Sequence, residues 1–447
     1  MKINYSSLRK GWAVAALSCL SVVAFSQGAP ATKPAAPATT PAPAATVPAK
    51  PATPTVITWS GFVKADYFYD TRQTVNAREG HLVFVPATIR RDANGADINA
   101  SPTVNMLAIQ SRLKVGITGP DFFNMKTSGA IEAEFLGVAN GDINGLRLRH
   151  AYVQLTGAKA QILMGQFWHP FFATDCFPGT YSFNTGMPFA TIERSPQFRV
   201  TSVGKTKVFG VLSTQRDFKT QGAGTDPTNT TIAANSYSGV SLSGLPAVSV
   251  GVSHSDGAFS AGATLDYKTV KPSLVNGSGI KTDVTLSSLS AHAYVKYKKG
   301  TTTFKAQTIY GNDLGDMLMV GGYGIMDSVG KDPKLTALGS SSSWVEVDGG
   351  TATLEWGVFA GYLTNLGFSD NLKTTTGVSG FLTDIKDAIR IAPRIGWKSG
   401  KTKIGVELEY TQVTRGAYKV GEKAITELAT DSKTSNTRLL VMAQYSF

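Results

Sequence analysis

The last twelve residues, 436–447, restrict the fold of this chain more than any other stretch, because they alternate between apolar and polar side chains. Successive side chains of a β-strand point to opposite faces, so the pattern predicts a strand with one apolar and one polar face. The apolar face carries Leu439, Val441, Ala443, Tyr445 and Phe447, and the polar face carries Arg438, Gln444 and Ser446. A charge that faces hydrocarbon at mid-depth costs about 2 to 4 kcal/mol. We therefore expect a closing strand with lipid outside and water inside.

The amino end has the anatomy of a secretory signal. Lys2, Arg9 and Lys10 precede an apolar segment, residues 12–25, and Ser26 fits a small-residue cleavage site. This arrangement predicts a signal peptide over residues 1–26 and export from the cytoplasm. A lipoprotein anchored through Cys19 is the alternative, but residues 16–18 match a lipobox poorly and the apolar run continues past the cysteine. Together with the closing strand, the signal predicts a bacterial outer-membrane barrel.

Residues 27–55 consist almost entirely of Ala, Pro and Thr, with Lys33 and Lys50 as the only charges. Recurrent proline favours extended chain and removes donors from helix and sheet ladders. We expect a periplasmic linker here. Binding of peptidoglycan or of a partner by this segment is the alternative.

From Val56 onward, alternating strands separated by glycine-rich turns predict an all-β domain over residues 56–447. No stretch after the signal is apolar for the roughly 18 residues that a membrane-spanning helix needs. Only residues 422–430 could form a short helix. Seven tight turns are predicted, at 119–121, 157–159, 204–206, 255–257, 299–301, 348–350 and 399–401. Eight longer loops alternate with them, so we predict a 16-stranded antiparallel transmembrane β-barrel with both ends of the domain in the periplasm.

Charged residues that share a predicted strand are spaced evenly and so lie on one face. The pairs are Lys64 and Asp66, Arg112 and Lys114, Glu132 and Glu134, Arg147 and Arg149, Arg390 and Arg394, and Glu407 and Glu409. Their odd-offset neighbours, such as Val63, Ile131 and Leu408, are apolar. A soluble sandwich could show the same alternation with its apolar face inward. The signal peptide, the terminal Phe447 and aromatic residues near strand ends favour the membrane barrel.

A barrel of this size encloses an aqueous passage, and the predicted inward charges favour anions. Nine cations face inward: Lys64, Arg112, Lys114, Arg147, Arg149, Arg199, Arg390, Arg394 and Arg438. Five anions oppose them: Asp66, Glu132, Glu134, Glu407 and Glu409. The clusters at 132–149 and 390–409 could instead pair across the wall. Lys64, Arg112, Lys114, Arg199 and Arg438 have no obvious partner in sequence and are the stronger candidates for selecting solutes.

The loop 169–196 follows the fifth predicted strand and is rich in aromatic residues. Folding into the lumen would bury these rings and narrow the pore, so we predict an inward-folded third loop. Its candidate constriction residues are Asp175, Tyr181, Glu193 and Arg194, with Asp175, Glu193 and Arg194 beside the passing solute. Packing over the mouth or against a neighbouring subunit is the alternative, since exposed apolar loops often mark interfaces.

Signals for enzymatic chemistry are weak. The five histidines are scattered and form no recognisable metal or catalytic motif, so we expect no enzyme activity, metal or cofactor. Asn140, Asp142 and Asn144 resemble a fragment of a calcium loop that lacks its glutamate, and a polar hairpin loop explains them better. Cys176 is expected to be a buried filler. Removal of the signal lowers the formal charge from +12 to +9; the cations form no runs with interleaved aromatics, so nucleic acid is not an expected partner.

Five short stretches resemble DcaP-like outer-membrane porins. They are Gly61–Asp70, Ser111–Leu113, Leu146–Val153, Gly165–Trp168 and Arg194–Arg199, all in the first third of the barrel. The resemblance implies a homotrimeric 16-stranded channel for small organic anions such as dicarboxylates. It also implies a basic channel lining that includes Lys64, Arg112, Arg147, Arg149, Arg194 and Arg199. Members of this family often carry an amino-terminal coiled coil, and here the Ala/Pro/Thr tract takes its place.

The predicted function is that of a porin that lets small anionic hydrophilic solutes diffuse through the outer membrane. We expect contact with outer-membrane lipid and lipopolysaccharide. A surface scaffold or adhesin with a sealed lumen is the second hypothesis, and a barrel hydrolase is the third. Conductance measured across a lipid bilayer separates the first hypothesis from the other two.

Overall fold

The computed structural model describes residues 54–220, 238–276, 278, 280–327 and 332–447. The predicted signal peptide, and the predicted linker as far as residue 53, lie outside the described residues. The described residues fold almost entirely into strands, with one short helix, α1 (Gly239–Ser243), and 3₁₀ turns at Asn140–Asp142 and Gly315–Met317. Within the described part of the chain, none of the helices is long and apolar enough to cross a membrane.

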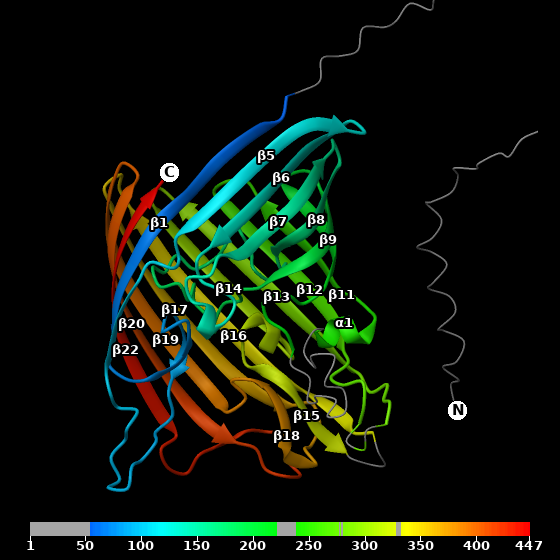
Figure 1. Cartoon of the computed structure of the whole chain (residues 1–447), viewed down its shortest axis with the longest axis vertical. Helices are drawn as coiled ribbons and strands as arrows, with labels where there is room; N and C mark the ends of the chain where they lie inside the picture. The colour runs from blue at the N-terminus through cyan, green and yellow to red at the C-terminus, as the bar shows by residue number, and fades with distance from the viewer. Residues whose placement is uncertain (1–53, 221–237, 277, 279, 328–331) are drawn as a thin grey trace, which may run out of the picture. The chain divides into compact units, whose positions relative to one another are not determined.

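Sixteen antiparallel strands of the described residues close into a barrel, as predicted (Figure 1). The first strand, β1 (Val56–Asp70), pairs along one edge with β5 (Arg112–Phe122) and along the other with the last strand, β22 (Lys433–Ser446). The other barrel strands are β6 (Met125–Glu134), β7 (Arg147–Thr156), β8 (Ala160–Trp168), β9 (Arg194–Ser202), β10 (Thr206–Ser213), β11 (Ala247–Ser255), β12 (Phe259–Val270), β13 (Leu286–Lys299), β14 (Thr302–Asn312), β16 (Lys334–Gly350), β17 (Leu354–Phe368), β19 (Ile385–Ser399) and β20 (Thr402–Ala417).

Shorter strands extend the barrel at the end that carries the long loops. The strand β4 (Thr103–Leu107) pairs with the far half of β1, so β4 and β5 act as one barrel strand interrupted at 108–111. The strands β15 (Gly321–Asp327) and β18 (Thr374–Phe381) pair with each other beyond the rim. A separate two-stranded hairpin, β2 (Thr74–Ala77) and β3 (Leu82–Pro86), lies within the first long loop.

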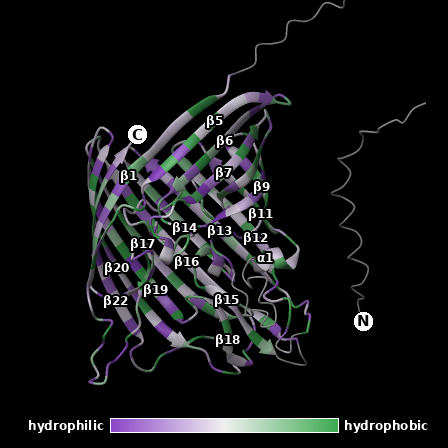
Figure 2. Ribbon diagram, viewed as in Figure 1, coloured by the Kyte–Doolittle hydropathy of each residue, from purple (hydrophilic) through white to green (hydrophobic). Residues whose placement is uncertain are grey.

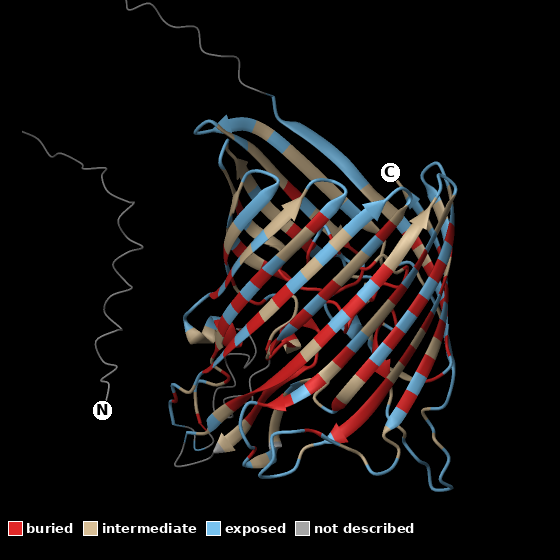
Figure 3. Cartoon of the chain, turned by 180° about the vertical axis from the view of Figure 1, so that it is seen from behind, coloured by how far each residue is buried: buried red, intermediate tan, exposed pale blue. Residues whose placement is uncertain are grey.

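The two faces of the barrel differ in polarity, as the even spacing of charges predicts. Val63, Ile131 and Leu408 are 57%, 50% and 45% exposed on the outer face. Arg149 and Glu407 point inward and are buried. Apolar and polar residues alternate along the strands in Figure 2, and buried and exposed residues alternate in Figure 3. The sheet therefore shows hydrocarbon side chains to the outside and charges to the interior, which identifies a membrane barrel of the bacterial outer membrane.

The predicted connections hold with three corrections. The turn expected at 348–350 lies at 351–353, because β16 continues to Gly350 and β17 begins at Leu354. The first tight turn lies at Phe123 and Asn124 rather than at 119–121, and both residues have the positive φ that a tight hairpin turn requires. The strand β5 runs through Pro120 because a register shift between Gly119 and Phe122 accommodates it. The helix expected at 422–430 is also wrong. Thr426–Glu427 forms the short strand β21, which pairs with β20.

The interior of the barrel is not an empty tube. Long loops turn inward from one end and bury apolar residues against the inner wall and against each other. One such cluster joins Leu82 and Phe84 of the first loop, Phe183 and Met187 of the third loop, and Leu318. These inward segments decide which parts of the wall still face open space.

Candidate functional site

The loop between β8 and β9, residues 169–193, crosses the interior and attaches to the opposite wall. The backbone amides of Tyr181 and Ser182 donate hydrogen bonds of 2.6 and 3.0 Å to Glu407 on β20. The amide of Gly179 donates to Glu346 on β16 at 2.8 Å. Carboxylates that accept backbone N–H groups form strong, charge-assisted bonds. The prediction of an inward-folded third loop is confirmed, and packing of this loop over the mouth is excluded.

The aromatic residues of this loop explain why it folds inward. Phe171, Phe183 and Phe189 are buried, and Phe189 packs edge-on against Phe359 of β17. Burial of apolar area stabilises a structure by about 25 cal/mol per Å², so these rings offset the cost of ordering the loop. Phe177 is the exception at 43% exposed. It lines a cavity described below.

The four predicted constriction residues differ in their surroundings. Asp175 is exposed, whereas Tyr181 is buried and its hydroxyl donates to Glu355 at 2.8 Å. Glu193 and Arg194 are buried rather than exposed to a passage. Burial, followed by the nearby carboxylate of Asp316, raises the pKa of Glu193 well above its usual range. Both residues sit at the root of the loop, where the backbone carbonyl of Glu193 accepts from the amide of His169, so they anchor the loop.

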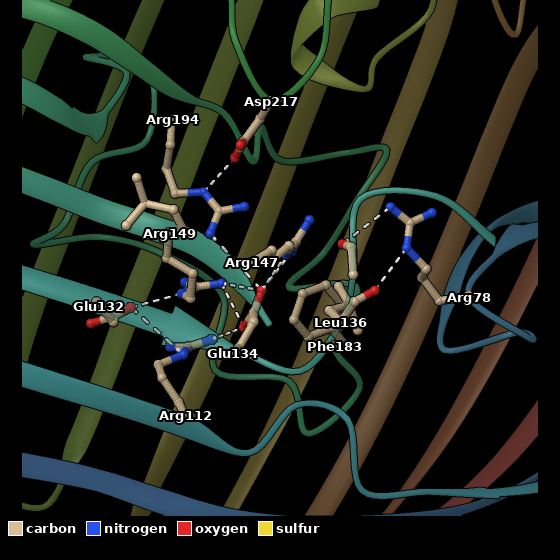
Figure 4. A network of polar contacts seen from close by, with 12 residues as sticks. Arg78, Arg112, Glu132, Glu134, Leu136, Arg147, Arg149, Phe183, Arg194 and Asp217 are labelled. Atoms are coloured by element: carbon tan, nitrogen blue, oxygen red, sulfur yellow. Dashed lines mark hydrogen bonds and ion pairs between the residues drawn. The ribbon is translucent and has the colours of Figure 1, made fainter. Parts of the chain in front are cut away.

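An arginine network lies on strands β5 to β9, which we call the cavity wall (Figure 4). Its centre is Glu134, which is fully buried and accepts hydrogen bonds from Arg112, Arg147 and Arg149 at 3.0, 2.5 and 2.8 Å. Arg194 approaches Glu134 to 4.0 Å. A carboxylate that is shared among several guanidinium groups fixes their positions, because each guanidinium donates to it in a bidentate or bridging arrangement.

Two further carboxylates complete this network. Glu132 binds Arg149 at 2.7 Å and Arg112 at 3.6 Å, and Asp217 binds Arg194 at 2.5 Å. Four arginines therefore meet three carboxylates, which leaves an excess positive charge. The alternative of pairing across the wall is correct for Arg147 and Arg149, but the pairing does not neutralise the cluster.

Three of the five cations expected to be without partners are ion-paired. Lys64 binds Asp66 at 3.0 Å, Arg438 binds Asp70 at 2.6 Å, and Arg112 binds Glu132 and Glu134. Lys64 and Asp66, two residues apart, share a face, and Asp70 lies opposite Arg438 on the neighbouring strand. Sequence spacing alone did not reveal the second of these pairs, because it depends on how the barrel closes.

Lys114 and Arg199 differ from those three. Neither forms a salt bridge with any described residue within 4.0 Å. Arg199 instead donates to the Gln197 side chain at 2.9 Å and to the carbonyl of Trp168 at 2.8 Å. Its guanidinium lies over the rings of Phe167 and Phe209. Such stacking leaves the positive charge uncompensated.

The second predicted cluster lies on β19 and β20. Arg390 pairs with Glu409 at 3.3 Å, as the pairing alternative expects. Arg394 pairs instead with Glu346 of β16, at 3.2 Å. Sequence reasoning missed several inward charges besides Glu346, although most of them lie an even number of residues from another charge in their strand. They are Asp70, Asp266, Lys268, Lys305, Asp348, Glu355 and Lys403.

Two adjoining cavities lie between the third loop and the wall. The larger, about 560 Å³, is lined by Arg112, Arg149, Lys403 and a single carboxylate, Glu132. The smaller, about 250 Å³, is lined by Arg199, Lys207 and Asp175. Polar and aromatic side chains complete both linings, and the cavities share Trp168, Phe172 and Thr174. The charged lining groups thus number five cations and two anions.

The described residues contain no cluster of three or more His, Cys, Asp or Glu side chains that could hold a metal ion. Asp142, in the fragment that resembles a calcium loop, accepts the amide of Val138 at 3.1 Å and so closes a hairpin loop. The thiol of Cys176 is buried beside the carbonyl of Val295, and burial raises its pKa to about 12. A thiol of this kind is a poor nucleophile.

Comparison with solved structures supports the fold. No protein-family model and no curated protein sequence matches the chain. The outer-membrane channel DcaP of Acinetobacter baumannii is similar, with 17% identity, 88% of this chain and 98% of that chain covered, and a TM-score of 0.61. An anion-selective porin from Comamonas acidovorans (11% identity) and the trimer form of OmpT from Vibrio cholerae (10% identity) each cover 88% of this chain and 100% of their own, with TM-scores of 0.50. The chain therefore has the fold of outer-membrane channels and porins.

Proposed function

We propose that this protein is an outer-membrane porin through which small anionic hydrophilic solutes, such as dicarboxylates, diffuse passively. The observation that carries the proposal is the lining of the two adjoining cavities, with five cations against two anions. Clefts with low-dielectric walls and one predominant sign of charge concentrate solutes of the opposite sign. Arg112, Arg149 and Arg199 are the predicted lining residues that this proposal retains.

The other predicted lining residues have different parts in the proposal. Lys64, Arg390 and Arg438 are buried and paired and line neither of the two cavities, so they support the wall and the loops rather than contact a solute. Arg147 and Arg394 form ion pairs behind the lining. Lys114 stays a candidate for attracting anions, since it lies on the same inward face as Arg112 and forms no ion pair with the residues that the structure describes. Lys207 and Lys403 are additions from the structure.

Assembly and surroundings belong to the same proposal. Similarity of fold to the DcaP channel, to an anion-selective porin and to a trimeric OmpT supports a homotrimer in the outer membrane. The apolar outer face would contact lipid and lipopolysaccharide. Contact between the linker and peptidoglycan is a further expectation.

Reversal potential in a planar bilayer under a salt gradient tests the proposal. The mature chain should prefer chloride to potassium, and a candidate dicarboxylate should reduce the chloride current. Replacing Arg112 and Arg199 with glutamine should move the reversal potential toward zero. Cation selectivity of the unaltered protein would contradict the proposal.

The inward loops favour one second candidate, a surface scaffold or adhesin with a sealed lumen. The first and third loops form a shared apolar cluster inside the barrel, as a plug would. Folded, inserted protein without any conductance would support this function. Conductance that scales with the amount of inserted protein would refute it.

A further inference from the structure

The hairpin β2–β3 in the first long loop is an inward element that was not predicted from the sequence. Thr74 pairs with Pro86 and Val75 with Val85, and the turn contains Arg78, Glu79 and Gly80 with positive φ. All five residues of β3 are buried, although a strand of a solvated hairpin should expose one face. Both faces of β3 must therefore be covered by protein.

One side of the hairpin packs on the third loop. Leu82 and Phe84 belong to the apolar cluster that contains Phe183 and Met187 of that loop. The amide of Val83 donates a hydrogen bond of 2.7 Å to the side chain of Asn184, which is also fully buried. Asn184 in turn approaches Glu409 of β20, at 3.3 Å. The hairpin and the third loop thus form one stacked unit inside the barrel.

The other side of the hairpin lies along β20 and β22, which contact β3 directly. Three arginines on neighbouring strands of this part of the barrel donate to backbone carbonyls of the hairpin. Arg390 reaches Phe84 at 3.2 Å, Arg415 reaches Pro86 at 2.7 Å, and Arg438 reaches Gly80 at 2.7 Å. We call strands β19, β20 and β22 the clamp wall.

Each of these arginines is also held by a carboxylate, which fixes the direction of its fork. Arg390 pairs with Glu409, Arg438 with Asp70 and Arg415 with Asp384. Arg390 donates in addition to the carbonyl of Met187 in the third loop. A planar guanidinium with five donors can bind a carboxylate and a carbonyl at once, which lysine cannot do with the same geometry.

We propose that the β2–β3 hairpin is a second constriction element, stacked on the third loop, and that Arg390, Arg415 and Arg438 are the positioning residues that hold it. This inference rests on the proposed channel function and deepens it. The third loop narrows the barrel from the β8–β9 side, and the hairpin fills space along the clamp wall. The passage is confined to the remaining space beside the cavity wall, so the hairpin sets the size limit for solutes.

The main experiment removes the hairpin without disturbing the wall. Residues 75–85 are replaced by a two-residue Gly-Ser connection, which is feasible because Thr74 and Pro86 lie opposite each other, as the ends of a tight turn do. Single-channel conductance and the swelling of liposomes in neutral sugars of increasing size are measured. Conductance should rise by about twofold, and larger sugars should enter, because pore diameter governs both.

The matched control shortens the same loop outside the barrel. Residues 92–96 are exposed and end in the bridge between Arg91 and Asp97, so a Gly-Ser replacement there removes chain but no interior contact. This variant should behave as the unaltered protein does. Heat-modifiable mobility in gels and circular dichroism confirm that each variant forms the barrel.

The outcomes separate this inference from the proposed function. Equal conductance and size limit in the unaltered protein and the hairpin variant would overturn the inference and leave the channel function intact. If the unaltered protein does not conduct and the hairpin variant does, the result would support the hairpin as a plug. It would overturn passive diffusion through the unaltered protein. If neither conducts, the channel function fails and the inference fails with it.

A second measurement tests the clamp itself. Val85→Cys is introduced into the mature chain in a Cys176→Ser background, and its reaction with a water-soluble thiol reagent is timed. Val85 is fully buried, so labelling should be slow. Adding Arg415→Ala should speed labelling about tenfold by favouring local opening, whereas Arg112→Ala on the cavity wall should not. Equal labelling rates in the Arg415→Ala and Arg112→Ala variants would overturn the positioning role.

Discussion

The cavity wall and the clamp wall both carry inward arginines, and the two walls use them differently. On the cavity wall, Arg112 and Arg199 are partly exposed and line open cavities. On the clamp wall, Arg390 and Arg438 are buried and donate to loop carbonyls. The loops cover one wall and leave the other facing space. The role of an inward arginine is therefore decided by what lies against it, since its strand position is equivalent in both walls.

The largest expected loss of stability comes from replacing Arg438 on the clamp wall. Arg438→Ala leaves Asp70 buried without its cation, and removal of one partner of a buried ion pair costs about 3 to 5 kcal/mol. Urea unfolding of the protein in lipid vesicles should show the loss. Lys114→Ala, on the other wall, should change the free energy of unfolding by less than about 0.5 kcal/mol. Equal losses would remove the distinction between the walls.

A smaller loss of stability is expected at the centre of the cavity wall. Glu134→Gln keeps the shape and an acceptor oxygen but weakens the hydrogen bonds from Arg112, Arg147 and Arg149. The expected loss is about 1.5 to 3 kcal/mol, the contribution of one hydrogen bond to a charged group. The same change adds a net positive charge beside the cavity. We expect lower stability together with stronger anion preference, measured by unfolding and by reversal potential. Stability lost without a change in selectivity would mean that the network is purely structural.

Removing a cation from the cavity wall should change anion selectivity more than removing one from the clamp wall. A unit charge at about 4 Å contributes about 1 kcal/mol in water, so Arg199→Gln should lower the preference for a monovalent anion by up to about fivefold. Arg390→Gln should change it little, because Arg390 is buried and paired with Glu409. Permeability ratios from reversal potentials provide the measurement. A larger shift from Arg390→Gln would reverse the assignment of the two walls.

The smallest expected effect is that of ionic strength on anion preference. The Debye length falls from about 10 Å at 0.1 M to about 3 Å at 1 M, so charges that line a wet cavity are screened. Anion preference should decline as ionic strength rises, while the buried pairs of the clamp wall keep the barrel equally stable. Selectivity that is independent of salt would point to steric selection at the stacked loops instead.

Much of the fold could be predicted from local pattern. Even spacing of charges correctly placed Glu132 and Glu134 inward and Ile131 outward, because side chains in a strand alternate between its two faces. The tight turns marked where one strand ends and the next begins. The aromatic residues of the third loop correctly predicted burial. The apolar run Leu82–Pro86 in an otherwise polar loop carried the same signal for the hairpin. It was missed because it is short.

The candidate site depended on contacts that no local pattern contains. Arg438 and Asp70 are 368 residues apart in sequence and meet only because β22 closes against β1. Glu193 and Arg194 adjoin the aromatic loop but are buried at its root. Sequence spacing cannot say which inward cations lie under a loop, since covering a wall requires segments from several distant parts of the chain.

The sequence by itself determined that this chain forms a barrel and which side of each strand faces inward, because both follow from the two-residue period of an extended backbone. The alternation of tight turns with long loops determined how many strands close the barrel. Only the tertiary structure decided which inward cations remain beside open space. That outcome depends on two loops packing together across the lumen, where burial of apolar side chains and the pairing of charges compete for the same wall.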